Sequence, residues 1–306
     1  MRAIWSCITY LAMWNLKRDV SGYEVRKINK IVRLLGTSAT QEHQSSCSRD
    51  HLFSIAPMME YTDKFQRFLM RMISRKSVLY TEMITANALT RTDNPTRFLG
   101  ANLPVEDLVV LQLGGADIER MRAAASMSYE YGYKEININV GCPSPKVAGS
   151  GCFGAALMQN PTLVSEISAS IFELQKKPVT VKCRIGVDDN DSYENLGNFI
   201  SKVSSEGYVK HFIIHARKAI LDPKFSPHDN RNIPPLKYSY VHRLVGDFPS
   251  LSFSINGGLN NYTSIQEQLT YGVRGVMVGR AVINNPYYWR NVDSLLYKEA
   301  DPGKLD

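Results

Sequence analysis

The chain has 306 residues, of which 44% are hydrophobic and 21% are charged, and its net charge is +7. This composition is that of a globular protein with a sizeable core and excludes a mainly disordered or fibrous chain. The five scattered cysteines form no C-x-x-C pair and no zinc-ligand spacing, so we expect neither a disulfide framework nor a metal site. No apolar run reaches the roughly 20 residues that span a bilayer. A basic balance is compatible with a nucleic-acid partner.

The first 50 residues differ from the rest of the chain. They carry eight Lys or Arg against four Asp or Glu, with a mostly apolar stretch at 3–16 and a serine-rich stretch at 37–50. This pattern resembles an organellar targeting extension, which predicts a mitochondrial or plastid location. A disordered tail on a cytoplasmic protein is the alternative. In either case we expect the folded domain to begin at His51.

A strand–helix alternation fills residues 51–290. The expected strands are 52–58, 79–83, 108–113, 135–140, 179–184, 212–216, 251–258 and 275–280. Apolar spacing and N-cap residues predict helices at 64–73, 118–131, 163–176, 194–205, 240–248 and 264–271. Eight strands that alternate with helices predict an α/β protein with a (β/α)8 TIM barrel. A doubly wound open sheet is less favoured, because no G-x-G-x-x-G turn follows the first strand.

The expected strands end in residues that suit a ligand, and ligands bind TIM barrels at this end. Gln112, Lys182 and His215 can hydrogen-bond to a heteroaromatic ring. Asn256-Gly257-Gly258 and Gly279-Arg280 follow the last two strands, where such barrels usually bind phosphate. Glycine lets backbone N–H groups approach an anion closely. Each motif alone is better explained by an ordinary structural role, but together they predict a phosphate-bearing cofactor.

The fourth strand leads into Asn139-Val140-Gly141-Cys142-Pro143. Pro143 and the following Pro145 hold the chain extended after the cysteine. A rigid turn at a strand end is suited to present a reactive thiol, whereas a buried structural cysteine is the alternative for this stretch alone. Cys152, in Gly151-Cys152-Phe153-Gly154, is a second candidate for the reactive group.

Taken together, the motifs resemble the tRNA-dihydrouridine synthase family over about residues 53–286. They are Ala56-Pro57-Met58-Met59, Tyr80-Thr81-Glu82-Met83, Asn139-x-Gly141-Cys142-Pro143, Val181-Lys182-x-Arg184, Ile214-His215-Ala216-Arg217, Asn256-Gly257-Gly258 and Met277-x-Gly279-Arg280. Three further segments, 188–193, 215–219 and 226–236, are similar to the A-type branch of the family. That branch acts on uridines 20 and 20a of the tRNA D-loop.

The resemblance implies a flavin-dependent oxidoreductase with FMN in the barrel mouth and NADPH as the reductant. Reduced FMN would pass hydride to C6 of a flipped uracil, and Cys142 would protonate C5. Flavin contacts carried over by position are Pro57, Met58, Met59, Gln112, Lys182, His215, Asn256, Gly257, Gly258, Gly279 and Arg280. Asn139 would hold the uracil, while His228 and Arg231 would contact the tRNA, with histidine at 228 where the family has lysine.

The sequence departs from the family after the eighth strand, where the family continues into a helical tRNA-binding domain. Only Tyr287 to Tyr297 could begin a helix here, so we expect a barrel over residues 51–290 and a truncated remnant over 291–306. We expect a monomer whose partner is tRNA, with no metal and no membrane contact. The alternatives are an FMN barrel that reduces a small molecule and a flavin- or RNA-binding form without turnover.

Overall fold

The computed structural model describes residues 51–100, 109–144, 147 and 153–299. The predicted targeting extension over residues 1–50 lies outside these described residues, as do Cys152 and residues 300–306 of the predicted remnant. Within the described ranges, no helix has the length and apolar character that a membrane span requires.

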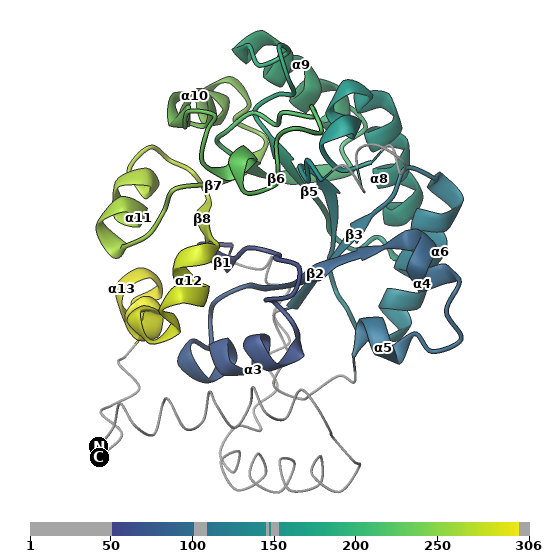
Figure 1. The fold of residues 1–306 in the computed structure, drawn as a ribbon, viewed down its shortest axis with the longest axis horizontal. Helices are drawn as coiled ribbons and strands as arrows, with labels where there is room; N and C mark the ends of the chain where they lie inside the picture. Colours follow the sequence, from purple (N-terminus) through teal and green to yellow (C-terminus); the bar gives the residue numbers. More distant parts are fainter. Residues whose placement is uncertain (1–50, 101–108, 145–146, 148–152, 300–306) are drawn as a thin grey trace, which may run out of the picture. The chain divides into compact units, whose positions relative to one another are not determined.

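Eight parallel strands form one sheet in the order β1-β8-β7-β6-β5-β4-β3-β2. They are β1 (Phe53–Ile55), β2 (Leu79–Thr85), β3 (Val109–Gly114), β4 (Ile136–Val140), β5 (Val179–Arg184), β6 (Val209–His215), β7 (Ser252–Asn256) and β8 (Gly275–Val278). The two end strands meet where the Ile55 N–H donates to the Val78 carbonyl at 2.9 Å and the Val78 N–H donates to the Phe53 carbonyl at 3.0 Å. The strands therefore close into the predicted TIM barrel, with the helices around them (Figure 1).

Ten α-helices and three short 3-10 helices connect or follow the described strands. They are α3 (Lys64–Ile73), α4 (Ala86–Thr90), α5 (Thr96–Leu99), α6 (Ile118–Glu130), η1 (Gly154–Gln159), α8 (Pro161–Gln175), α9 (Tyr193–Ser204), η2 (Asp229–Arg231), α10 (Tyr238–Asp247), α11 (Tyr262–Leu269), α12 (Arg280–Asn284), η3 (Pro286–Asn291) and α13 (Val292–Tyr297). The predicted N-cap Asp63 is confirmed, because its carboxylate accepts from the Phe65 and Gln66 N–H groups at 3.1 and 2.9 Å. This cap satisfies two of the N–H groups that a helix start leaves free.

Several predicted boundaries are wrong in ways that matter for the site. β1 ends at Ile55 and β7 ends at Asn256, so the residues that follow them lie in loops rather than in strands. β8 ends at Val278, and Arg280 begins α12 instead of ending the strand. The loops approach the barrel mouth from outside the sheet, and local alternation of side chains cannot show where a strand gives way to such a loop.

Along each strand, side chains alternate between the layer that faces the helices and the barrel interior. In β4, Ile136, Ile138 and Val140 are fully buried in the main apolar core, which packs the strands against the helices. Asn137 and Asn139 alternate with them and therefore face the barrel interior. Cys183 also belongs to the main core and is fully buried, so it is a structural cysteine.

Residues after β8 pack against the first strand. Trp289 of η3 is fully buried and its ring lies 5.4 Å from that of Phe53. The Tyr297 hydroxyl of α13 accepts from the Phe53 N–H at 3.0 Å. Asp293 accepts from the Ser74 hydroxyl at 2.5 Å. The predicted helix over 287–297 is thus present as two short helices, and the assignment of 291–306 to a remnant of a further domain stays a prediction.

Candidate active site

The polar residues predicted at the strand ends meet at one end of the barrel. They are Gln112 of β3, Asn139 of β4, Lys182 of β5, His215 of β6 and Asn256 of β7. Strand pairing sets Asn139 opposite Lys182 and His215 opposite Asn256. Because all strands are parallel, these side chains surround the same mouth. They form the candidate active site.

Cys142 sits in a turn that the Asn139 side chain holds. The Oδ1 atom of Asn139 accepts from the backbone N–H groups of Gly141 and Cys142 at 3.1 and 3.0 Å. The Cys142 carbonyl accepts from the Ala155 N–H at 2.9 Å. The thiol is free and half-buried, so a substrate in the mouth can reach it while the turn restricts its position.

Positive charge is concentrated around the mouth. Burial, together with the charge of Arg184, lowers the pKa of Lys182 to about 8. Burial lowers the pKa of His215 well below its usual value, and Arg184, Lys182, Arg217 and Arg280 lower it further. His215 is therefore neutral at pH 7. Among the described residues, no Asp or Glu contributes to these two shifts. An anionic ligand would relieve this excess of positive charge.

At two glycines after β7, a Cβ atom would collide with a neighbouring side chain. Gly257 has φ +109°, and a Cβ atom there would lie 2.6 Å from Cδ2 of His215. Gly258 has φ +71°, and its Cβ would lie 2.8 Å from the Tyr238 hydroxyl oxygen. That hydroxyl donates to the Gly257 carbonyl at 2.6 Å. Only glycine fits both the backbone conformation and the close approach of these side chains.

Comparison with known proteins shows which family the chain belongs to. The family model for dihydrouridine synthase matches residues 54–304. The chain is 46% identical to the tRNA-dihydrouridine(20/20a) synthase of Synechocystis sp. over 248 residues, which cover 81% of this chain and 72% of the relative. It is 43% identical to the tRNA-dihydrouridine(20/20a) synthase of Escherichia coli over 278 residues, which cover 91% of this chain and 77% of the relative. The chain belongs to the dihydrouridine synthase family.

A more distant likeness supports the fold of this dihydrouridine synthase family member. A 2-naphthoyl-CoA reductase in complex with 2-naphthoyl-CoA matches with a TM-score of 0.61 at 9% identity. The match covers 78% of this chain, which spans about half (49%) of that protein's chain. At this identity the likeness carries the barrel architecture alone.

Arg184 is a site residue that the sequence interpretation placed in a motif but gave no role. Its buried guanidinium donates to the carbonyls of Gly141 at 3.1 Å, Lys218 at 3.0 Å and Asn230 at 2.8 Å. It thereby ties the turn before Cys142 to the long segment between β6 and α10. Burial lowers the pKa of Arg184 to about 10, which still leaves it charged at pH 7. Its place two residues beyond Lys182, on the same face of β5, is the signal that could have identified it.

Gly154 is a second residue without a predicted role. Its φ is +67°, and a Cβ atom there would be 2.5 Å from the Cys142 carbonyl oxygen. Sequence interpretation considered this stretch only for Cys152. Gly154 begins η1, which therefore lies directly against the turn that holds Cys142.

The remaining predicted flavin residues lie near the mouth in loops. The Met58 N–H donates to the Thr62 hydroxyl at 3.0 Å, which closes the tight turn after Pro57, and Met59 in this turn is exposed. A Cβ atom on Gly279 would meet Met58 Sδ at an ordinary 3.5 Å, so crowding does not require glycine there. The β1 loop and the residues before α12 are thus neighbours.

The predicted tRNA residues lie on the rim of the mouth, and Asn232 links one of them to Arg280. Arg280 donates to the Asn232 Oδ1 atom at 3.0 Å, and the Asn232 amide donates to the His228 carbonyl at 3.1 Å. His228 is on the surface, with 72% of its side chain exposed. Arg231 is half-buried, and its Nε atom has no hydrogen-bond partner among the described residues. The segment that carries both residues is thus joined to Arg280 through Asn232.

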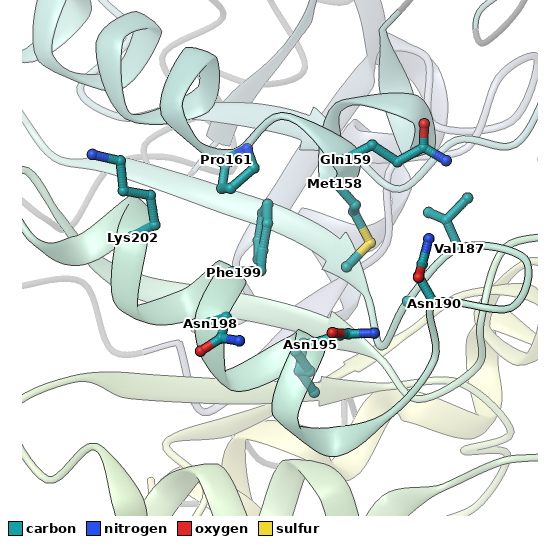
Figure 2. Close-up of a pocket in the computed structure, with 11 residues that line it drawn as sticks. Met158, Gln159, Pro161, Val187, Asn190, Asn195, Asn198, Phe199 and Lys202 are labelled. Carbon is teal, nitrogen blue, oxygen red and sulfur yellow. The ribbon is translucent and has the colours of Figure 1, made fainter.

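A separate cavity of about 420 Å³ lies between α8, α9 and the loop after β5. Figure 2 shows Met158 and Phe199 within it, with Asn195, Asn198 and Lys202 of α9 along one side. None of the predicted site residues lines it. The described residues contain no group of three or more His, Cys, Asp or Glu that could hold a metal ion.

Proposed function

We propose that this chain reduces uridine in tRNA to 5,6-dihydrouridine, using FMN and NADPH. The observation that carries the proposal is the free thiol of Cys142, held in a fixed turn beside the cationic mouth of the barrel. Relatives that are 43 to 46% identical are named tRNA-dihydrouridine(20/20a) synthases, which supports positions 20 and 20a of the D-loop as targets.

The residues around the mouth fit FMN. The glycines at 257 and 258 let His215 and Leu236 pack directly on the backbone after β7, and Lys182 with Arg280 would balance a phosphate and an electron-rich ring. Binding an anion raises the pKa of Lys182 again, so its ammonium stays charged next to the ligand. The proposed contacts are those that the resemblance implies, namely Pro57, Met58, Met59, Gln112, Lys182, His215, Asn256, Gly257, Gly258, Gly279 and Arg280.

When bound and reduced by NADPH, FMN supplies a hydride for C6 of the uracil. The chain's own part is to deliver a proton to C5. We assign this step to the Cys142 thiol, which donates its proton to C5, becomes a thiolate and is then protonated again from solvent. Arg184 and Lys182 lie within electrostatic range of Cys142.

The uracil must leave its base stack to reach this thiol. Asn139 uses its Oδ1 atom on the turn and one amide hydrogen on Gln112, at 2.9 Å, which leaves one N–H for a uracil carbonyl. Arg231 and His228 on the rim would contact the tRNA backbone, because most hydrogen bonds to nucleic acids go to phosphate and sugar oxygens. This arrangement favours a macromolecular substrate over a small one.

The test is formation of dihydrouridine in unmodified tRNA by the purified chain with NADPH, with the modified positions mapped by mass spectrometry. The Cys142→Ala variant should keep bound flavin and its reduction by NADPH but lose turnover on tRNA. Cys152→Ala is the matched control and should retain turnover. A protein that oxidises NADPH and leaves tRNA unchanged would instead support a small-molecule reductase.

A further inference from the structure

A chain of hydrogen bonds crosses the barrel interior beneath Cys142. From Asn139 it runs through Gln112 (2.9 Å), Asn137 (2.8 Å) and Thr180 (3.0 Å) to the carboxylate of Glu135 (3.1 Å). Strand pairing makes it possible, because Asn137 of β4 lies opposite both Gln112 of β3 and Thr180 of β5. The chain joins the turn at the mouth to a residue that precedes β4.

The backbone N–H groups at the mouth fix the direction of the bonds between the side-chain amides. At the mouth, the backbone N–H groups of Gly141 and Cys142 can only donate, so Asn139 must present its oxygen to them. Its Nδ2 atom then donates to the Gln112 oxygen, and the Gln112 nitrogen donates to the Asn137 oxygen.

At the other end, the Thr180 hydroxyl donates to the Glu135 carboxyl oxygen. The hydroxyl oxygen is then free to accept from the Asn137 amide. A single orientation of all three side-chain amides therefore satisfies every bond.

Burial keeps the side chains in this orientation. Gln112, Asn137, Thr180 and Glu135 are between 0 and 3% exposed. Water cannot readily replace a lost partner at such sites, and an unsatisfied buried polar group costs free energy. The second carboxylate oxygen of Glu135 lies 3.2 Å from His51 Nε2, which holds the carboxylate itself in place.

We propose that Glu135 and Thr180 are positioning residues for Cys142, acting through the amides of Asn137, Gln112 and Asn139. The Glu135 carboxylate orients the Thr180 hydroxyl, and the chain of amides passes this orientation to the Asn139 oxygen that holds the Cys142 turn. The catalytic meaning of this assignment rests on the proposed function of Cys142. The positioning itself does not, and it can be measured without tRNA.

The first measurement compares Thr180→Val with Thr180→Ser by hydrogen–deuterium exchange of the purified full chain. Valine keeps the shape of threonine but removes the hydroxyl, whereas serine keeps the hydroxyl. In Thr180→Val, we expect the Gly141 and Cys142 amides to exchange about fivefold faster, since the net value of a buried hydrogen bond is about 1 kcal/mol. In Thr180→Ser they should exchange as in the parent chain. Amides of β7 and β8 should not change in either variant.

The second measurement separates positioning from general damage. With NADPH alone, flavin reduction should proceed at the parental rate in both variants, because Cys142 takes no part in it. With tRNA, kcat of Thr180→Val should fall about tenfold at unchanged KM, and Thr180→Ser should restore it. If no variant and no parent chain acts on tRNA, the proposed function fails, and the exchange result alone decides the positioning.

Equal exchange of the Gly141 and Cys142 amides in Thr180→Val and Thr180→Ser would overturn the proposal. If Thr180→Val does not fold, Asn137→Leu provides the same test, because leucine fills the volume of asparagine and interrupts the chain one residue nearer to Cys142. The same faster exchange at residues 141 and 142 is expected there. Parental exchange in a folded Asn137→Leu would equally contradict the proposal.

Discussion

Gly154 lies directly against Cys142. A Cβ atom on Gly154 would be 2.5 Å from the Cys142 carbonyl oxygen and 3.3 Å from the Cys142 Cβ atom. The next residue, Ala155, donates its N–H to that same carbonyl at 2.9 Å. The position of the thiol therefore depends on a residue that has no side chain.

We predict that Gly154→Ala displaces the Cys142 turn. Turnover on tRNA should fall about 100-fold, as expected when a reacting group moves by about 1 Å, while flavin binding is retained. Steady-state kinetics and the flavin absorption spectrum measure the two effects. Gly197→Ala in α9 is the matched control, because a Cβ atom there meets nothing within 4 Å. It should keep full activity and gain up to about 1 kcal/mol of stability from helix propensity. Full activity in Gly154→Ala would contradict the prediction.

Arg184→Met should lower the free energy of unfolding by about 3 kcal/mol, because three carbonyls, of which that of Asn230 is in a buried hydrogen bond, lose their charged donor. Urea unfolding at pH 7 measures the change. Arg290→Met is the control, since Arg290 is exposed, covers the Tyr287 ring at 4.7 Å and donates only to the nearby Tyr287 carbonyl at 3.5 Å. It should change stability by less than about 1 kcal/mol. Similar stability losses in the two variants would show that Arg184 does not fasten the loops.

Lys182→Met should stabilise the flavin-free chain. The pKa of Lys182 is about 8 when folded and about 10.4 when unfolded, so between these values the unfolded chain binds more protons. Lys182 therefore costs stability below pH 8, and the cost disappears as pH rises toward 10. Because the side chain is partly exposed, we expect a gain of about 2 kcal/mol at pH 7. Chemical unfolding at pH 7 and pH 10 tests this, and a gain that is equal at both values would refute the partly desolvated charge of Lys182 as its cause.

His215 should make the protein less stable in mild acid. Its pKa is well below the usual value when folded, whereas the unfolded chain takes up a proton below about pH 6.5. The unfolded state then binds more protons, and stability falls as pH falls from 6.5, by up to about 1.4 kcal/mol per pH unit for each such histidine. His211 shifts in the same direction. We expect His215→Gln to halve the slope between pH 6.5 and 5.5, and an unchanged slope would count against a role for His215.

The sequence by itself determined the order and nature of the main elements. α3 and β5 begin and end where the sequence predicts, at Lys64–Ile73 and Val179–Arg184. An N-cap aspartate, helical apolar spacing and strand alternation are local signals, and a barrel whose units repeat one local pattern can be predicted from them. The motifs at the strand ends likewise predicted the family, which the comparison confirmed.

Tertiary structure decided how the site is held. Arg184 donates to the Asn230 carbonyl, 46 residues away in the sequence. The Asn139 oxygen accepts from the Cys142 N–H, while its amide nitrogen donates to Gln112. Gly154 and Thr180 gain their importance only from neighbours that other segments supply. Local patterns encode which backbone conformation a segment adopts. Which donor meets which acceptor inside the barrel depends on the register of distant strands, and only the closed barrel fixes that.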